Sequence, residues 1–560
     1  MTRLRRLSQV SKSWQQLVFD GQLWVRLDVH AFPKLHPNVL MRLAETSGGF
    51  VRAFDLSHHP TLTPEILMDI THHVCVHPGP TGEKNTWLTS INLEGCPLIT
   101  TRALHHLLIR SPKLQRLCLR GLTAVTNTTC EVLAAYCPRL LALDMGRCLN
   151  LTSEGIRSVA SKAADRGEQI PLKELRLSGL RRVTDEMMYA LGRAAPHLEV
   201  LDLSYAKDLH NSSVEAFVAC SEVDASNFDT VLLTSREAGR DQLDTNRHWR
   251  RVTRLRHLNL SACLMLTDHA CSHLAYAVPK LELLELAAIG PDLHDDGLVR
   301  LLNTTPYIRK LDLEDATEVT DAVLDALTPT LPVPPPPSPA TTGSGSGSAT
   351  PASAGVAPEP GHALEHLIVS YANVESEALA ELIRSCPRLR VLEADNTRLT
   401  GLVLRDFVQR ARERRRKDVK VVAVDCRSVG EHTVRELAAD CTRPRMGWRA
   451  WQARKLQYLD ERDEEELGVG QDECDPHRVV VKTFYSWQTV DQVRAAREKK
   501  RKSNTRRGLN ASGGSHIEED AGASSTPVRT RWWSPSGRRS GPATPTLDFS
   551  ERGGDGCTIM

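Results

Sequence analysis

Apolar residues recur along the chain in one motif, apolar-x-x-apolar-x-apolar, as at Leu114, Leu117 and Leu119. From Leu88 onward, the first residues of successive motifs are 26, 26, 32, 26, 57, 26, 27, 56, 25 and 30 residues apart. Alternating apolar positions are typical of a short strand with one face in a core. Their regular return predicts a stack of similar units that share a continuous core.

The residues between the motifs complete each unit. A Pro-x-Leu step precedes many of the motifs, as at Pro112, and proline both ends a helix and directs the chain into the next strand. After the strand, a Thr-Asp step such as Thr184–Asp185 can cap a helix, and an apolar helical stretch such as 103–109 follows. Units of strand, turn and helix with a period near 26 predict an α/β leucine-rich-repeat solenoid, or horseshoe.

Breaks in the period divide the chain. The repeats are expected over 29–440, interrupted by a polar surface loop at 221–250 and by a Pro-, Ser- and Gly-rich insertion at 329–361. That insertion is predicted to be disordered, because it cannot bury enough apolar area to offset its ordering entropy. Residues 441–498 are predicted to cap the last repeat, with a strand near 479–487, and 499–560 to be a disordered basic tail.

Cysteine falls at related positions of several units, either three residues after the last strand leucine or just before the proline. We interpret these thiols as small buried residues, because free cysteine is among the most buried residue types. No Cys-x-x-Cys pair occurs, so the sequence predicts no metal site and no cofactor. The residues concerned are Cys96, Cys148, Cys263, Cys137 and Cys386.

The N-terminal residues place apolar side chains at steps of three and four, which predicts one face of a helix. A helix capping the repeats would explain them. Followed by a Leu-Trp pair and placed before cysteine-containing repeats, the segment also resembles the second half of an F-box, and the whole chain resembles F-box/leucine-rich-repeat proteins. We therefore expect a partial, all-α F-box at 1–28 whose adaptor-binding residues are Leu7, Val10, Trp14, Leu17 and Trp24.

The resemblance implies a role for the chain. Members of this family are substrate receptors of Skp–cullin–F-box ubiquitin ligases: the F-box binds the Skp adaptor, and the repeats hold a protein for ubiquitination and degradation. The first F-box helix does not precede Leu7 here. We expect either that the sequence is incomplete or that adaptor binding is weakened. The alternative is a repeat protein that acts as a scaffold or inhibitor without assembling a ligase.

The residues between the strand leucines should line the concave sheet face, which is the usual binding surface of a solenoid. In the C-terminal half these residues are mostly acidic. They are either a site for a basic segment of an unknown protein substrate or ordinary solvated charges. The predicted substrate-binding residues are Arg116, Asp144, Asp202, His257, Glu285, Asp312, Glu314, Glu393, Asp395 and Asp425.

The chain ends Cys557-Thr-Ile-Met, which fits the signal for prenylation, with farnesyl favoured by the final methionine. A basic run at 494–507 precedes it. That run could strengthen a peripheral membrane contact, act as a nuclear-import signal, or simply be solvated. We expect a cytoplasmic or nuclear protein, with membrane association through a farnesylated Cys557 as one outcome.

Composition narrows the classes further. The 560 residues carry 71 Lys and Arg against 69 Asp and Glu, and this balance argues against a nucleic-acid binder. The catalytic motifs of metalloproteases, serine hydrolases, P-loop proteins and dinucleotide enzymes do not occur, so we predict a non-catalytic subunit.

Overall fold

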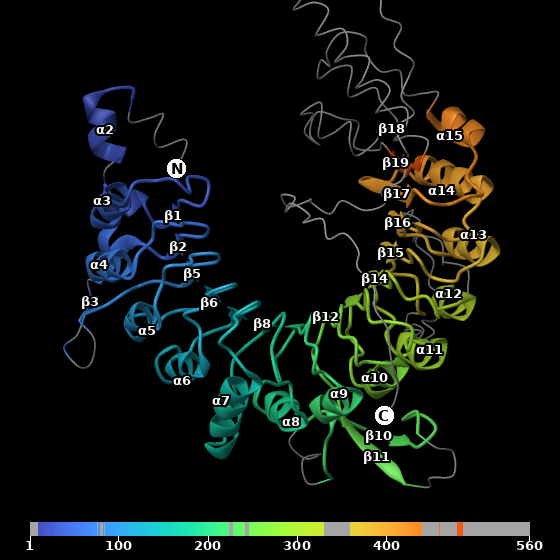
Figure 1. Ribbon diagram of the computed structural model, residues 1–560, viewed down its shortest axis with the longest axis horizontal. Helices are drawn as coiled ribbons and strands as arrows, with labels where there is room; N and C mark the ends of the chain where they lie inside the picture. Colours follow the sequence, from blue (N-terminus) through green and yellow to red (C-terminus); the bar gives the residue numbers. More distant parts are fainter. Residues whose placement is uncertain are drawn as a thin grey trace, which may run out of the picture. The chain divides into compact units, whose positions relative to one another are not determined.

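The computed structural model describes residues 9–438 except 19, 76, 79–81, 83, 223–227, 241–245 and 330–358, together with 458–459 and 479–484. Over these residues the repeats form one parallel sheet on the inner side of a curved stack, with the helices on the outer side (Figure 1). The predicted α/β leucine-rich-repeat solenoid is confirmed. In this part of the chain, no helix is long and apolar enough to span a membrane.

Most strands of the sheet contain only three residues, and each pairs in parallel with the strand of the next repeat. In sheet order they are β1 (Arg26–Asp28), β2 (Ala53–Asp55), β5 (Ser90–Asn92), β6 (Arg116–Cys118), β7 (Ala142–Asp144), β8 (Glu174–Arg176), β9 (Val200–Asp202), β12 (His257–Asn259), β13 (Leu283–Glu285), β14 (Lys310–Asp312), β15 (His366–Ile368), β16 (Val391–Glu393), β17 (Val419–Ala423), β19 (Val479–Thr483) and β18 (Tyr458–Leu459).

The helices follow the strands in a regular alternation. They are α2 (Lys12–Val18), α3 (Pro37–Ser47), α4 (Pro64–Val74), α5 (Thr101–Ile109), α6 (Asn127–Tyr136), α7 (Ser153–Asp165), α8 (Asp185–Ala194), α9 (Asn211–Val218), α10 (Asp268–Leu274), α11 (Asp295–Leu302), α12 (Asp321–Leu327), α13 (Ser376–Ser385), α14 (Gly401–Glu413) and α15 (Glu431–Ala438), with short 3₁₀ turns at Gly21–Leu23 and Gly48–Phe50.

The repeated leucines explain why the units stack. Leu284 and Leu311, the middle residues of β13 and β14, are fully buried and lie opposite each other in the sheet register. The predicted threonine caps are also present: Thr184 and Thr320 accept hydrogen bonds from the first turns of α8 and α12. Because every unit buries its leucines against its neighbours, the core is continuous along the stack.

One residue in the turn after most strands has a positive φ. Glycine, which tolerates this conformation without strain, occupies the position at Gly121, but Arg147, Tyr205 and Tyr371 occupy it in other repeats. The amide of this residue donates to a carbonyl of the next repeat, as from Tyr371 to Asp395 at 2.8 Å. The turns therefore continue the backbone hydrogen bonding of the sheet, which holds their side chains at fixed places along one edge.

The cysteines join successive repeats as the pattern predicts. The thiols of Cys96, Cys148 and Cys263 are buried and donate to the carbonyl oxygens of Leu56, Leu119 and Leu203 in the preceding repeats, at 3.1, 3.2 and 3.2 Å. Burial raises the pKa of the Cys263 thiol to about 12, so it remains protonated at neutral pH. Cys137 and Cys386 are also buried, and the interpretation of these five residues as buried thiols is confirmed.

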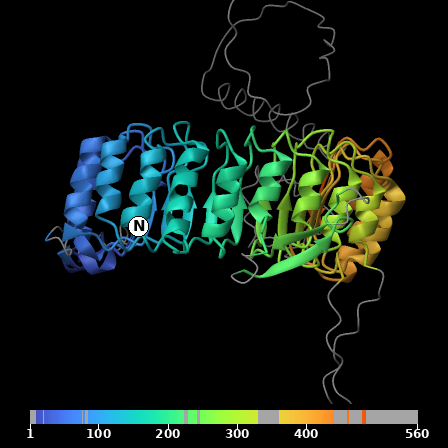
Figure 2. The ribbon, with the colours of Figure 1, turned by 90° about the horizontal axis from the view of Figure 1, so that it is seen from below.

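The insertion at 221–250 differs from the predicted surface loop. It contains an antiparallel hairpin of β10 (Thr230–Thr234) and β11 (Arg247–Arg251), which crosses the helix layer near α9 and α10 (Figure 2). A second, smaller pair, β3 (His77–Pro78) and β4 (Lys84–Asn85), follows α4. The polar composition of the insertion had suggested full exposure, but Arg250 and Arg251 are both buried.

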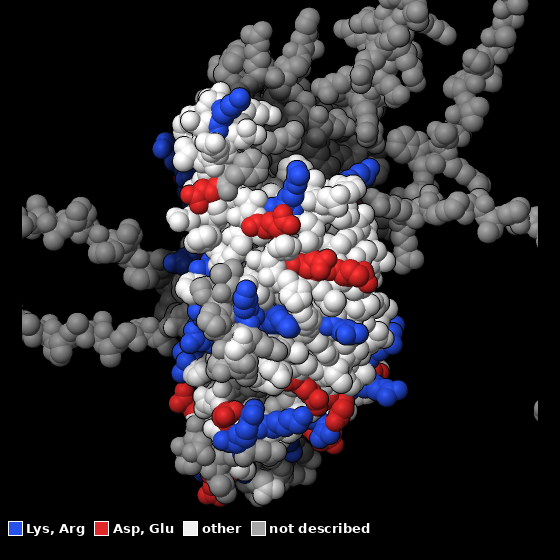
Figure 3. Space-filling model, turned by 90° about the vertical axis from the view of Figure 1, so that its left-hand side faces the viewer, with Lys and Arg blue, Asp and Glu red and all other residues white. Residues whose placement is uncertain are grey.

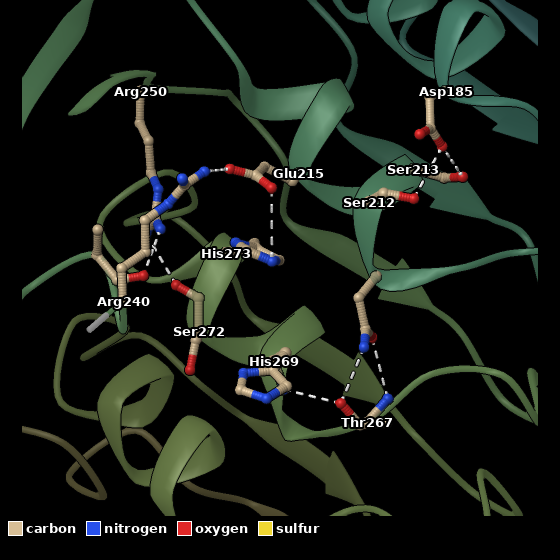
Figure 4. A network of polar contacts seen from close by, with 12 residues as sticks. Asp185, Ser212, Ser213, Glu215, Arg240, Arg250, Thr267, His269, Ser272 and His273 are labelled. Atoms are coloured by element: carbon tan, nitrogen blue, oxygen red, sulfur yellow. Dashed lines mark hydrogen bonds and ion pairs between the residues drawn. The ribbon is translucent and has the colours of Figure 1, made fainter. Parts of the chain in front are cut away.

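Arg250 attaches the hairpin to the solenoid. Its guanidinium donates to the carbonyl oxygens of Ser272 and Ala275 at 2.8 and 3.0 Å, and to that of Ala238 at 2.8 Å. Beside it, Glu215 pairs with Arg240 and lies 3.8 Å from His273 (Figure 4). Burial lowers the pKa of Arg250 to about 10, so the side chain stays charged at neutral pH.

The sheet continues past the last repeat. β19, within the strand predicted near 479–487, pairs in parallel with β17 and covers its edge. Almost all of the insertion predicted at 329–361, most of 441–498, and the whole tail at 499–560 with Cys557 lie outside the described residues. Disorder of the insertion and tail, prenylation and the cellular location stay predictions.

Candidate protein-interaction surfaces

The N-terminal end of the solenoid exposes large apolar side chains. Val10, Trp14 and Leu17, predicted to bind an adaptor, are 65, 45 and 58% exposed. Of the 20 large apolar residues exposed in the described part of the chain, eight lie within 10–50. Clusters of this kind commonly mark protein-binding sites. The remaining members of the eight are Leu23, Val25, Phe32, Val39 and Phe50.

Trp24 has a different position from the other predicted adaptor residues. It is only 6% exposed, and its indole nitrogen donates to the carbonyl oxygen of Val18 at 2.7 Å. This bond ties the end of α2 to the first repeat and leaves Trp14 and Leu17 on the surface. Trp24 therefore holds the helix in place from inside the core. Leu7 lies outside the described residues.

Charged side chains of both signs are spread over this end of the molecule. On the side that carries α2, α3 and α4, Lys, Arg, Asp and Glu side chains alternate with larger uncharged areas, and no single sign of charge dominates (Figure 3). The uncharged areas with exposed Trp and Leu are suited to apolar docking.

The ten predicted substrate-binding residues lie on the concave face or at its edge. Seven lie in strands β6 to β16, and Glu314, Asp395 and Asp425 lie in the turns after β14, β16 and β17. Several strand carboxylates have a local role: Asp144 and Asp202 each accept a hydrogen bond from the amide two residues later, at 2.9 Å. These bonds shape the turn after the strand, whereas Arg116 is exposed on β6.

Two of the predicted acidic residues are neutralised by their own neighbours. Glu285 lies 3.3 Å from the His257 ring, and it accepts hydrogen bonds from Lys310 at 3.0 Å and from the Asn259 amide at 2.9 Å. The contacts with His257 and then with Lys310 lower the pKa of Glu285 to about 2. Glu393 lies in the same way 3.8 Å from His366 and 3.4 Å from Lys420. His366 and Lys420 were not among the predicted residues, because their contacts with Glu393 cross between strands of different repeats.

A group of less compensated carboxylates lies at the edge of the concave face. We call Glu314, Asp315, Asp395 and Asp425 the acidic rim; it surrounds Tyr371 in the turns that follow β14 to β17. Burial raises the pKa values of Glu314 and Asp395, and neighbouring carboxylates raise them further. At Asp395 a hydrogen bond from the Val424 amide at 2.6 Å, and then Lys482, oppose the effect.

Burial and then all four rim carboxylates raise the pKa of the Tyr371 phenol. The rim thus concentrates negative potential around an exposed aromatic ring. Tyr371 was not among the predicted binding residues, because only the folded turns bring it beside the four carboxylates.

Asp312 belongs neither to the acidic rim nor to the pair Glu285 and Glu393. Its carboxyl lies 3.8 Å from the Lys310 ammonium, and burial raises its pKa. In the described residues, no group of three or more His, Cys, Asp or Glu side chains is arranged to hold a metal ion.

Comparison with known proteins gives a match at the N-terminus. The F-box-like family model matches residues 1–30. Among solved structures, the complex of Rad7 and Elc1 from yeast is 14% identical over 77% of this chain and 94% of that chain, with a TM-score of 0.41. The TLR13–ssRNA13 complex is 15% identical over 64% of this chain and 41% of that chain, with a TM-score of 0.33. Scores this low carry no argument about function.

Proposed function

We propose, from the premise that this chain joins an F-box-like segment to a leucine-rich-repeat solenoid, that it is the substrate-recognition subunit of a Skp–cullin–F-box ubiquitin ligase. The observation that carries the proposal is the exposed apolar surface of Val10, Trp14 and Leu17 inside the matched segment. In this proposal, α2 contributes to the contact with the Skp adaptor, while the solenoid holds a protein for ubiquitination. The subunit itself performs no chemical step.

We place the substrate on the concave face, where a basic segment docks against the acidic rim. The raised pKa values of Glu314 and Asp395 support this assignment, because an added cation would stabilise their ionised forms. A lysine or arginine side chain could also lie over the exposed Tyr371 ring. Glu285 and Glu393 contribute less, because His257, Lys310, His366 and Lys420 already occupy their carboxylates.

Replacing both Trp14 and Leu17 by alanine is expected to weaken capture of the Skp adaptor by at least about tenfold, because hot-spot aromatic and apolar side chains dominate such contacts. Co-purification of the full chain with recombinant Skp adaptor and cullin measures the effect. Both side chains are largely exposed, so the variant should keep its fold.

A matched control replaces Leu264 and Met265, which are 61 and 50% exposed in the turn after β12. This double variant should capture the adaptor as the parent does. Failure of the parent to bind the adaptor, or equal binding by both variants, would exclude α2 as an adaptor contact.

Reversing the charge of the rim at Glu314, Asp395 and Asp425 with lysine is expected to reduce binding of a fluorescent Lys/Arg-rich peptide at least about tenfold. Binding to the parent should weaken as pH falls, because the raised pKa values allow the rim to lose its charge early. Fluorescence anisotropy at several pH values and salt concentrations measures both effects.

The control reverses Asp325 and Glu377, which are exposed on α12 and α13 in the helix layer of the same region. Two reversals change the net charge by +4, against +6 for the three reversals of the rim variant, and they leave the concave face unaltered. If it weakens the peptide as much as the rim variant, the attraction is a general charge effect and the assignment of the rim is wrong.

A further inference from the structure

The hairpin insertion creates a cavity that the repeats alone do not form. The cavity has a volume of about 530 Å³ and lies between the C-terminal ends of α8 and α9, the turns that lead into β9, β12 and β13, and residues 228–229 and 251–253 beside β11. A volume of this size is in the usual range for small-molecule sites. Insertions into a repeat often carry binding functions, so this cavity differs from an ordinary gap between units.

Basic side chains line it from three consecutive repeats. His197, Arg254 and Lys280 hold the same position in their repeats, one residue before the first leucine of the motif and three residues before β9, β12 and β13. The three strands pair in register, so these residues occupy equivalent backbone positions in adjacent repeats. Arg254 and Lys280 are exposed enough to turn toward a ligand.

Arg251, the last residue of β11, adds a buried cation to the lining of the cavity. It is 3% exposed, lies 5.7 and 5.6 Å from the centres of the Phe217 and Phe228 rings, and donates to the Phe217 carbonyl oxygen. Its approach requires Gly192, since a Cβ atom there would collide with the guanidinium and with the Phe217 carbonyl. The wall is thus built around a fixed guanidinium.

We propose that this cavity binds a small organic phosphate monoester. Its lining contains three permanent cations, Arg251, Arg254 and Lys280, against one carboxylate, Asp229, which leaves a charge of +2 with His197 neutral. A phosphate monoester carries up to two negative charges near neutral pH, which matches this value. The volume leaves room for an organic group beyond the phosphate, and the site is independent of the adaptor and substrate surfaces.

Titration of the full chain with phenyl phosphate, followed by calorimetry, tests the proposal. We expect saturable binding of one molecule per chain, competition by inorganic phosphate, and no binding of phenol at the same concentration. Changing both Arg254 and Lys280 to glutamine should weaken binding at least about tenfold. Neither change touches the buried Arg251, so loss of binding would not reflect loss of the hairpin.

The control changes Arg139 and Arg388 to glutamine, which hold the equivalent turn position before β7 and β16 and do not line the cavity. It should bind phenyl phosphate as the parent does. Lack of saturable binding, equal weakening by both double variants, or binding that survives the Arg254 and Lys280 changes would overturn the proposal.

Discussion

Replacing Arg250 by alanine is expected to lower the free energy of unfolding by about 3 to 5 kcal/mol, because three buried carbonyl oxygens each lose a hydrogen bond, at about 1 to 3 kcal/mol for each unsatisfied group. The substitution leaves the carbonyl oxygens of Ser272, Ala275 and Ala238 without the guanidinium that now bonds them. Because α10 supplies or adjoins two of these oxygens, the loss should reach beyond the hairpin. Guanidinium denaturation measures the loss of global stability, and amide hydrogen exchange over 228–251 measures the loosening of the hairpin.

Arg247 provides the comparison, since it lies on the same strand, β11, but is exposed. Its change to alanine should alter the free energy of unfolding by less than about 0.5 kcal/mol. Arg250→Lys should fall between the two, because an ammonium keeps the charge but cannot span three acceptors in the way a planar guanidinium can. If Arg250→Ala unfolds like the Arg247 variant, the hairpin is not held by this side chain.

The solenoid was predictable because its information is local and repeated. Leu284 and Leu311 recur at a spacing that only a stacked strand and helix unit explains, and the threonine caps confirm each boundary independently. The hairpin was not predictable in the same way. It occurs once, its strands are polar, and the burial of Arg250 depends on carbonyl groups that lie more than 20 residues away in the chain.

The candidate binding surfaces were also only partly predictable from the sequence. Alternation along a strand correctly places Glu285 and Glu393 on the sheet, but their partners come from neighbouring repeats and determine how much charge each presents. For Trp24 the sequence pattern was not sufficient. Its position in an F-box-like motif does not determine which face of the segment packs into the core. Burial of that ring follows from its bond to the Val18 carbonyl, which only the three-dimensional arrangement reveals.

Glu285→Gln is expected to remove stability on the order of 3 kcal/mol at neutral pH, together with part of the pH dependence of unfolding. The contact with His257, and then Lys310, lowers the pKa of the carboxyl from 4.5 to about 2 in the folded state. A group whose pKa is lower when folded stabilises the fold above its unfolded pKa. The parent should therefore lose this contribution as the pH falls from about 4.5 towards 2, whereas glutamine has no such contribution to lose. Urea unfolding at pH 7 and pH 3 compares the two proteins.

The difference between the proteins is the informative quantity, because Asp312 and Glu314 have raised pKa values and shift the acid profile of both in the opposite sense. Glu318→Gln, an exposed change in the turn after β14, should leave stability and its pH dependence as in the parent. If the free energies of unfolding of Glu285→Gln and the parent differ by the same amount at pH 7 and pH 3, the Glu285 side chain contributes through packing and not through its charge. In that case His257 and Lys310 do not form the ionic link that joins β12, β13 and β14 across the concave face.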